Sequence, residues 1–366
     1  STRGTSDLTI DDAAGTNKTG GLDRDYITNW SYGIAESFNV FIPNFMGGGS
    51  TEALSRDSNI GEALRGRVQN PDQVLQNIPT YWGDQPFVTG PYYMGAVVVF
   101  LFFFGLFFIK DRSKWWLLAT TVLIFGLSYG KNMMWLTDLF IDNVPMYNQF
   151  RAVASILVVA MLTLPLLGFM ALNKLFKGDY DKEEAMKSLK MSAGITGGLA
   201  LFFALAGGSL FDFEGLRDEM FANAGMLNEL IADRKEMMRA DAFRSFVFVA
   251  LAATALWAFM NQKIQAKHAI IGLGALILVD LWSIDKRYLN DESFVPKRQM
   301  ETPFQASQAD LQILQDPDPN YRVYHLGERL DAGARTAYFH KSLGGYHPAK
   351  LKRYQELVDL QINRRN

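Results

Sequence analysis

Residues 92–109 read YYMGAVVVFLFFFGLFFI, an uncharged run of 18 residues that ends directly before Lys110. An α-helix needs about 20 apolar residues to cross the hydrocarbon core of a bilayer. Two tyrosines stand at the start of the run, where aromatic side chains mark the boundary between lipid and water. The run therefore predicts a helix that spans a membrane.

Five further stretches have the same apolar character, and charged loops separate them. They are residues 115–129, 153–172, 192–211, 243–260 and 268–284. One such stretch alone would be an ordinary buried core helix, but six in a row argue against a soluble protein. We therefore predict a mainly α-helical transmembrane bundle of about six spans over residues 91–284. Residues 1–90 and 285–366 then lie outside the bundle.

Lysine and arginine are concentrated in alternate loops, and this predicts the orientation of the bundle. The loops 110–114, 173–191 and 261–267 hold three, five and two of these residues. The loop 130–152 holds only Lys131 and Arg151, and the loop 212–242 is more acidic than basic. Because loops rich in lysine and arginine stay in the cytoplasm, we predict that both ends of the chain and the other loops are extracytoplasmic.

The composition narrows the classes of function. The net charge of −2 gives no sign of a nucleic-acid partner. The chain has no cysteine, which excludes a disulfide, a thiolate nucleophile and a cysteine-based metal site. The three glycines at 47–49 do not form a phosphate-binding loop, since no Lys-Ser or Lys-Thr follows them. No pattern supports a divalent metal or another bound cofactor.

The segments outside the bundle differ in character. Residues 1–90 are rich in small polar residues and predict irregular structure with short helices, packed over the spans. Within the loop 212–242, apolar residues recur at helical spacing, which predicts an outer amphipathic helix over 214–241. In the tail, residues 321–326 alternate like a strand and residues 349–362 read as a helix, so we predict a small α/β unit. Both ends read as mid-domain sequence, and we expect this chain to be part of a longer protein.

The loop 138–151 is the first candidate for a binding site. It places Asp138, Asp142, Asn148 and Arg151 at the outer mouth of the bundle. A guanidinium at the start of a span can bind a phosphate at the level of the lipid headgroups, because its fork of N–H groups matches two phosphate oxygens. The alternative is an arginine that only anchors the span at the interface.

The second candidate lies in the tail, over residues 338–347 and the helix that follows. Several cations and aromatic residues occur close together there, a set that could hold a phosphate and stack on a sugar ring. The histidines and cations are His340, Lys341, His347, Lys350, Lys352 and Arg353. The alternative is a solvated basic helix face after a Gly-Gly turn. The spacing of the two histidines does not fit a zinc site.

Asp280 is a third candidate, because it is a carboxylate near the outer end of the last predicted span. Ionisable residues inside spans are functional by default. An aspartate near the interface can also be hydrated, or pair with Lys286 or Arg287.

Four stretches carry a family resemblance. They are YWGDQPF at 81–87 leading into GPYY at 90–93, SYGKN at 128–132, VPMYNQFRAV at 144–153 and YFHKSLGGYH at 338–347. In this order, along nearly the whole chain, they resemble the YfhO-type family of bacterial membrane proteins, in the form found in Bacteroidetes-like bacteria.

The resemblance implies a multi-pass, GT-C-like glycosyltransferase of the bacterial cytoplasmic membrane. Such an enzyme takes a sugar from a polyprenyl-phosphate donor at the outer face and transfers it to a cell-envelope glycan or polymer. By the same resemblance Arg151, with Tyr147 and Asn148, contacts the donor phosphate or the acceptor, and His340, Lys341 and His347 do so more loosely. The catalytic carboxylate of these enzymes lies in the first outer loop. We therefore expect it upstream of this chain, and expect the chain alone to be inactive.

Asp142, Asp280 and Arg353 would support such a site. The alternative is a polytopic membrane scaffold, or a lipid-handling or transport protein, without enzymatic activity. A transporter is expected to carry broken helices and polar groups at mid-membrane. The apolar stretches of this chain are clean except at their ends, which favours the enzyme.

Overall fold

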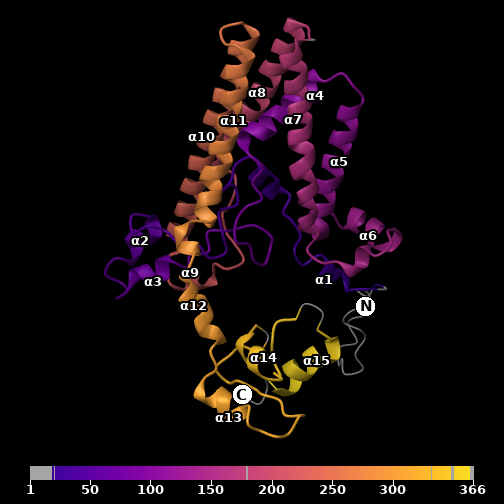
Figure 1. Cartoon of the computed structure of the whole chain (residues 1–366). Helices are drawn as coiled ribbons and strands as arrows, with labels where there is room; N and C mark the ends of the chain where they lie inside the picture. Colours follow the sequence, from indigo (N-terminus) through magenta and orange to yellow (C-terminus); the bar gives the residue numbers. More distant parts are fainter. Residues whose placement is uncertain (1–18, 20, 179, 331, 348–349, 363–366) are drawn as a thin grey trace. The chain divides into compact units, whose positions relative to one another are not determined.

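The computed structural model describes residues 19, 21–178, 180–330, 332–347 and 350–362 of the chain (Figure 1). The chain divides into two compact units, one over Asn17–Tyr288 and the other including Leu289–Asn366. The larger unit contains the predicted bundle, and the smaller one contains the predicted tail.

Six long helices of the larger unit lie side by side (Figure 1). They are α4 (Ala96–Phe108), α5 (Ser113–Ser128), α7 (Ala160–Lys177), α8 (Lys182–Ala206), α10 (Leu227–Met260) and α11 (Ala266–Tyr288). Four of them, α7 with the turn before it, α8, α10 and α11, are long and apolar enough to cross a membrane, whereas α4 and α5 are apolar but shorter. A mainly helical fold with several helices able to span a membrane is thus confirmed. The number of six spans stays a prediction.

Short helices precede the long ones or connect them. The α-helices are α1 (Arg24–Ile27), α2 (Asn59–Leu64), α3 (Pro71–Leu75), α6 (Met134–Asn143) and α9 (Glu219–Asn223), and the 3₁₀ helices are Ala35–Val40, Gly130–Met133, Tyr147–Gln149, Val153–Val159 and Gly207–Ser209. We call the end of the bundle where α4, α7 and α10 terminate the basic end, because lysines cluster there. The opposite end, where α1, α2, α3, α6 and α9 lie (Figure 1), is the loop-rich end.

Helix α4, which contains most of the uncharged run 92–109, lies in the core of the bundle. Most of its side chains are buried, because α7, α8 and α10 pack around it. Gly105 and Gly168 allow α4 and α7 to approach closely. A Cβ on Gly105 would lie 2.6 Å from the backbone oxygen of Leu167, and one on Gly168 would lie 2.8 Å from Cβ of Leu101. Small residues at helix contacts are the usual means of tight packing in membranes.

The sequence predicts that residues 1–90 pack over the bundle. Residues 34–46 instead extend into it. The chain rises between the long helices (Figure 1), and the ring centre of Phe45 lies 4.7 Å from that of Phe203 on α8. The backbone oxygen of Phe41 accepts a hydrogen bond of 2.8 Å from Ser245 of α10. Irregular backbone is tolerated between membrane helices where protein buries it and satisfies its polar groups.

Helix α10 runs without a break from Leu227 to Met260, which corrects the predicted separate helix over 214–241. At 1.5 Å per residue its length is about 51 Å, more than the roughly 30 Å of a hydrocarbon core. No Gly or Pro occurs in residues 227–260. No helix-breaking residue therefore separates the charged part of the helix from the apolar stretch 243–260. Its first part packs with α2, α3 and α9 around a small apolar cluster, which consists of Ile60, Leu64, Leu75, Ile78, Phe221 and Leu230.

Arg234 on α10 holds two loops at the loop-rich end. Its side chain is fully buried, and its guanidinium donates two hydrogen bonds of 2.7 Å to Asp218. It also donates to the backbone oxygens of Pro79, Thr80 and Phe213, at 2.6, 3.1 and 2.7 Å. A buried cation is tolerated only when it is paired and hydrogen-bonded. Two loops that are far apart in the sequence therefore meet at this side chain.

The smaller unit is built from short helices. They are α12 (Lys297–Glu301), α13 (Gln308–Ile313), α14 (Arg335–Phe339), α15 (Lys352–Leu357), the 3₁₀ helices Asp291–Ser293 and Thr302–Phe304, and a π-helical turn, Val358–Ile362. The predicted α/β tail is not confirmed, because the described residues contain no strand. Val323 and Ser342 form one parallel bridge instead, and the pairing ends before the turn at Gly345 (φ 127°).

Cysteine labelling should place the two ends of the bundle on opposite sides of a membrane. The chain has no cysteine, so a single substitution at an exposed position introduces a unique thiol. The variants are Asp111→Cys, Lys177→Cys, Gln265→Cys, Met146→Cys and Leu216→Cys. We expect the first three to react with a membrane-impermeant maleimide from one side and the last two from the other. If Asp111→Cys reacted from the same side as Met146→Cys, α4 and α5 would not cross the membrane.

Removing the Arg234 side chain should destabilise the protein strongly. Arg234→Met leaves Asp218 without its cation, which costs about 3–5 kcal/mol of unfolding free energy for a buried pair. Thermal unfolding of the purified protein in detergent measures the loss. Arg239→Met, an exposed arginine of the same helix, is the matched control and should have little effect. Equal stability of the two variants would contradict the role of Arg234.

Candidate functional site

Four consecutive residues, Trp30–Gly33, form the centre of the loop-rich end, and we call them the hub. The indole N–H of Trp30 donates to the backbone oxygen of Phe87 at 3.3 Å. The backbone oxygen of Trp30 accepts from the backbone N–H of Ala154 at 3.2 Å. Trp30 therefore joins the stretch 81–87 to the chain that leads into α7.

The hub also binds the stretch 128–132. The backbone N–H of Lys131 donates to Ser31 Oγ, and that of Tyr32 donates to the backbone oxygen of Ser128, both at 2.8 Å. Gly130 lies in the left-handed region (φ 48°), which favours glycine. A Cβ at this position would lie 2.1 Å from Ser31 Oγ, so the close approach also requires glycine.

A buried carboxylate, Glu36, lies beside the hub. It accepts hydrogen bonds from the Tyr81 hydroxyl at 2.7 Å, the Asp84 backbone N–H at 2.8 Å and the Gln85 side chain at 3.1 Å. The backbone N–H of Gly33 donates to it at 3.2 Å. Burial raises the pKa of Glu36, and the hydrogen bonds act in the opposite direction. The stretch 81–85 thus folds around Glu36, which acts as a structural acceptor closed to solvent.

Asp84 is an exposed carboxylate of the same stretch. The side-chain amide of Asn132 donates to Asp84 Oδ2 at 2.9 Å and to the backbone oxygen of Tyr32 at 3.0 Å. Asn132 therefore fixes Asp84 at the hub and leaves the carboxylate open to solvent.

Arg151, the predicted phosphate ligand, lies against two aromatic rings at the loop-rich end. Its guanidinium carbon is 5.5 Å from the ring centre of Tyr26 and 5.6 Å from that of Trp30. One N–H donates to the Tyr26 hydroxyl at 2.6 Å. Cation–π contacts of this kind orient the plane of a guanidinium. Met146 (φ 67°) and Ala152 (φ 63°) are left-handed on either side of this loop, a strain that clusters at functional sites.

The other predicted residues of this loop help to hold it in place. Tyr147 is half-buried, and its ring centre lies 5.7 Å from that of Phe140. The backbone oxygen of Asn148 accepts a hydrogen bond of 2.9 Å from the segment before α1. Asp142 pairs with Arg24 at 3.0 Å. The structure thus brings Arg151 to the hub. Tyr147, Asn148 and Asp142 instead make contacts that hold the loop in place.

Asp280 on α11 is buried and pairs with Arg244 of α10 at 2.8 Å. The expected partners, Lys286 and Arg287, are not the ones it uses. Arg287 pairs with Asp241 of α10 at 2.7 Å instead. Two ion pairs of opposite polarity therefore fasten α10 to α11, and Asp280 has a structural partner in the bundle.

The candidate residues of the tail belong to the smaller unit, so a face shared with Arg151 and Asp280 stays a prediction. His340 is buried, and its Nε2 lies 3.0 Å from Asp310, which also pairs with Arg335 at 2.6 Å. His340 is thus part of the core of its unit. Three of the predicted residues are exposed, namely Lys341, His347 and Arg353.

The sequence patterns did not point to the hub, to Glu36 or to Arg234. One signal could have identified the hub, because the tripeptide Ser-Tyr-Gly occurs twice, at 31–33 and 128–130. The two copies pack against each other in the fold. Glu36 and Arg234 carry no such signal, since their partners lie up to 155 positions away in the chain.

Among the described residues, no group of three or more His, Asp or Glu side chains is placed to hold a metal ion. Comparisons with known protein families, curated proteins and solved structures give no match to this chain. The family resemblance of the four stretches therefore stays a prediction.

Replacing Glu36 should change how stability depends on pH. Because burial raises its folded-state pKa above the ordinary value of 4.5, the folded protein keeps a proton that the unfolded chain releases. Stability of the wild type should therefore fall as pH rises from about 4.5 through the raised pKa. Glu36→Gln should lack this component of the fall, as measured by thermal unfolding between pH 4.5 and 8. Glu62→Gln, an exposed control, should keep it. A wild-type pH slope in Glu36→Gln would contradict the assignment.

Proposed function

We propose that this chain belongs to a membrane glycosyltransferase, which transfers a sugar from a polyprenyl-phosphate donor to a cell-envelope acceptor at the loop-rich end. One observation supports this most. The stretches 81–87, 128–132 and 144–153 meet at the hub, and Arg151 lies there against Tyr26 and Trp30. The proposal takes the loop-rich end as the extracytoplasmic one.

The chemistry of Arg151 suits a phosphate-linked donor. A guanidinium offers two parallel N–H groups to phosphate oxygens, and it stays charged at any physiological pH. Exposed aromatic rings of the same loops, Phe87 and Phe150, are 43% and 66% exposed. Such rings provide flat apolar surfaces against which the C–H face of a sugar can stack.

Helix α6 suits the lipid part of such a donor. It exposes Trp135 and Leu139, by 71% and 53%, and buries Thr137 and Ile141. A short helix with one apolar face exposed is typical of segments that lie in the membrane interface. Helix α6 ends at Asn143, shortly before Arg151 in the chain. A polyprenyl chain held on α6 would therefore lead toward the guanidinium.

In the proposed reaction, the acceptor hydroxyl oxygen bonds to the anomeric carbon while the bond from that carbon to the phosphate oxygen breaks. The phosphate leaves with the electron pair, and a carboxylate takes the hydroxyl proton. Arg151 stabilises the charge that develops on the leaving phosphate. Asp84 is an exposed carboxylate at the hub, and it can be tested as this base.

The test is transfer of a labelled sugar from a polyprenyl-phosphate donor by the protein in its full natural length. Arg151→Ala should lower kcat about 100-fold, the usual effect of removing a group that stabilises developing charge. Arg151→Lys should keep part of the activity, since it retains the charge without the fork. Arg65→Ala, an exposed arginine paired with Asp57 at 3.2 Å, is the matched control and should be unchanged.

Each other outcome is informative. Wild-type rates in Arg151→Ala would remove Arg151 from the mechanism. A loss in Asp84→Asn as large as that in Arg151→Ala would place the base in this chain and not upstream. Absence of transfer by the wild type with any polyprenyl-phosphate donor would favour a non-enzymatic scaffold or lipid-handling protein.

A further inference from the structure

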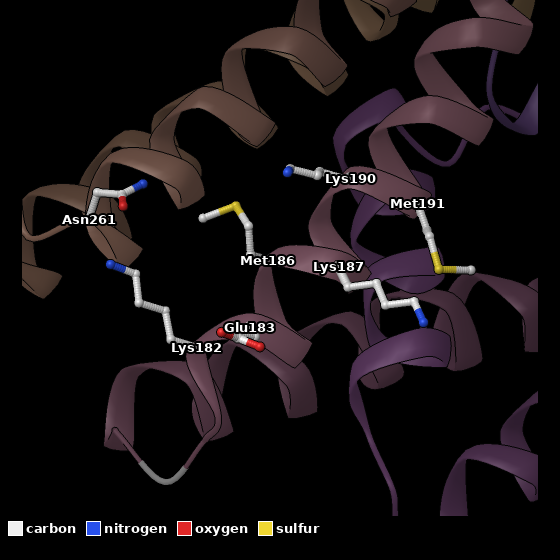
Figure 2. A pocket seen from close by; sticks show the side chains of 7 residues that line it. All are labelled: Lys182, Glu183, Met186, Lys187, Lys190, Met191 and Asn261. Carbon is white, nitrogen blue, oxygen red and sulfur yellow. The ribbon is translucent and has the colours of Figure 1, made fainter.

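An open groove of about 510 Å³ lies at the basic end, on the opposite end of the bundle from the hub. The first turns of α8 form most of its wall, and Asn261, just after α10, closes one side. Figure 2 shows the Lys182 side chain extending toward Asn261, and Lys190 beyond Met186 on the same helix. Because of this position, the groove is independent of the proposed glycosyltransferase site.

The groove is positively charged. Lys182, Lys187 and Lys190 line it together with one acidic residue, Glu183, so the charge balance is about two positive charges. The three lysines are exposed, and no salt bridge involves them among the described residues. Lys110, at the same end, differs in that it pairs with Glu184 at 2.6 Å. The groove lysines therefore remain available for an anion.

The groove lies where the charged part of α8 gives way to its apolar part. Residues 182–190 contain most of the charges of the helix, and the uncharged stretch begins at Met191. Lys182 and Lys190 are about 12 Å apart along the axis at 1.5 Å per residue. The headgroup region of a bilayer is several ångströms deep beyond each side of the hydrocarbon core. Lysine side chains reach along the helix into that region.

We propose that this groove binds the headgroup of an anionic phospholipid. Its lysines would contact the phosphodiester, and Met186 and Met191 would contact the upper part of the acyl chains. Basic pockets between membrane helices bind acidic lipid headgroups through this combination of charge and apolar wall. A free phosphate would use the lysines alone, and the methionines would then contribute nothing.

The experiment titrates the purified full-length protein in neutral detergent with dioleoylphosphatidylglycerol, and counts bound lipid by native mass spectrometry. Dioleoylphosphatidylcholine and inorganic phosphate are the other two probes. The wild type should bind phosphatidylglycerol in preference to both. The triple variant Lys182→Gln, Lys187→Gln, Lys190→Gln should bind it at least about tenfold more weakly. The triple variant Lys177→Gln, Lys263→Gln, Lys267→Gln changes the same charge at the same end, outside the groove, and should bind like the wild type.

Weaker binding in a variant could also result from misfolding, so a second variant is designed to bind more strongly. Glu183→Gln removes the one negative charge of the groove and should strengthen phosphatidylglycerol binding about fivefold. Equal weakening in the two triple variants would show diffuse attraction to the basic end and overturn the proposal. Equal binding of phosphatidylcholine, or full displacement of the lipid by inorganic phosphate, would overturn it as well.

Discussion

A guanidinium removed from water must find an acceptor for nearly every N–H group it carries, and this requirement organises the loop-rich end. Arg234 meets it with one carboxylate and the backbone oxygens of residues 79, 80 and 213. Residue 81 follows at once, and its hydroxyl donates to Glu36, which in turn accepts from the hub. The loop with the family resemblance thus begins at a buried arginine on α10 and ends at the hub. Its position depends on a charge that no solvent can reach.

The bundle could be predicted because apolar runs of this length have few stable alternatives. The predicted stretches and the observed helices correspond, although α7 starts with a 3₁₀ turn over Val153–Val159 and α4 is shorter than its apolar run. The insertion of residues 34–46 could not be predicted, since Ser37, Asn39 and Asn44 give the segment the appearance of a surface loop. Its polar groups are satisfied by residues far along the chain, such as Asp241, which accepts from the backbone N–H of Asn44. The continuity of α10 could not be predicted either, because the change from a charged to an apolar sequence indicates two separate helices, an outer amphipathic one and a span.

The site shows the same division. Arg151 is a conspicuous candidate because it is a lone cation at the start of an apolar stretch, and the fold places it against two aromatic rings. Its role as a phosphate ligand stays a prediction. Asp280 and His340 are conspicuous too, but each is buried and has a charged partner within its own unit. A sequence shows that a charge occurs in an apolar setting, but it does not show whether another residue of the chain neutralises it. Whether a charge is neutralised becomes visible only when the fold shows which helices pack together, as α10 does with α11 and α13 with α14.

The crossed ion pairs between α10 and α11 also bear on how the protein is made. Arg244 and Asp241 are synthesised before Asp280 and Arg287, so α10 forms before its ionic partners on α11 exist. Arg244 and Asp280 lie inside the predicted spans 243–260 and 268–284, and a charge inside a span costs a few kcal/mol on an isolated helix. The cost falls when α11 follows and supplies the opposite charges at 2.8 and 2.7 Å. We therefore expect α10 and α11 to insert together as a hairpin and not as successive single segments.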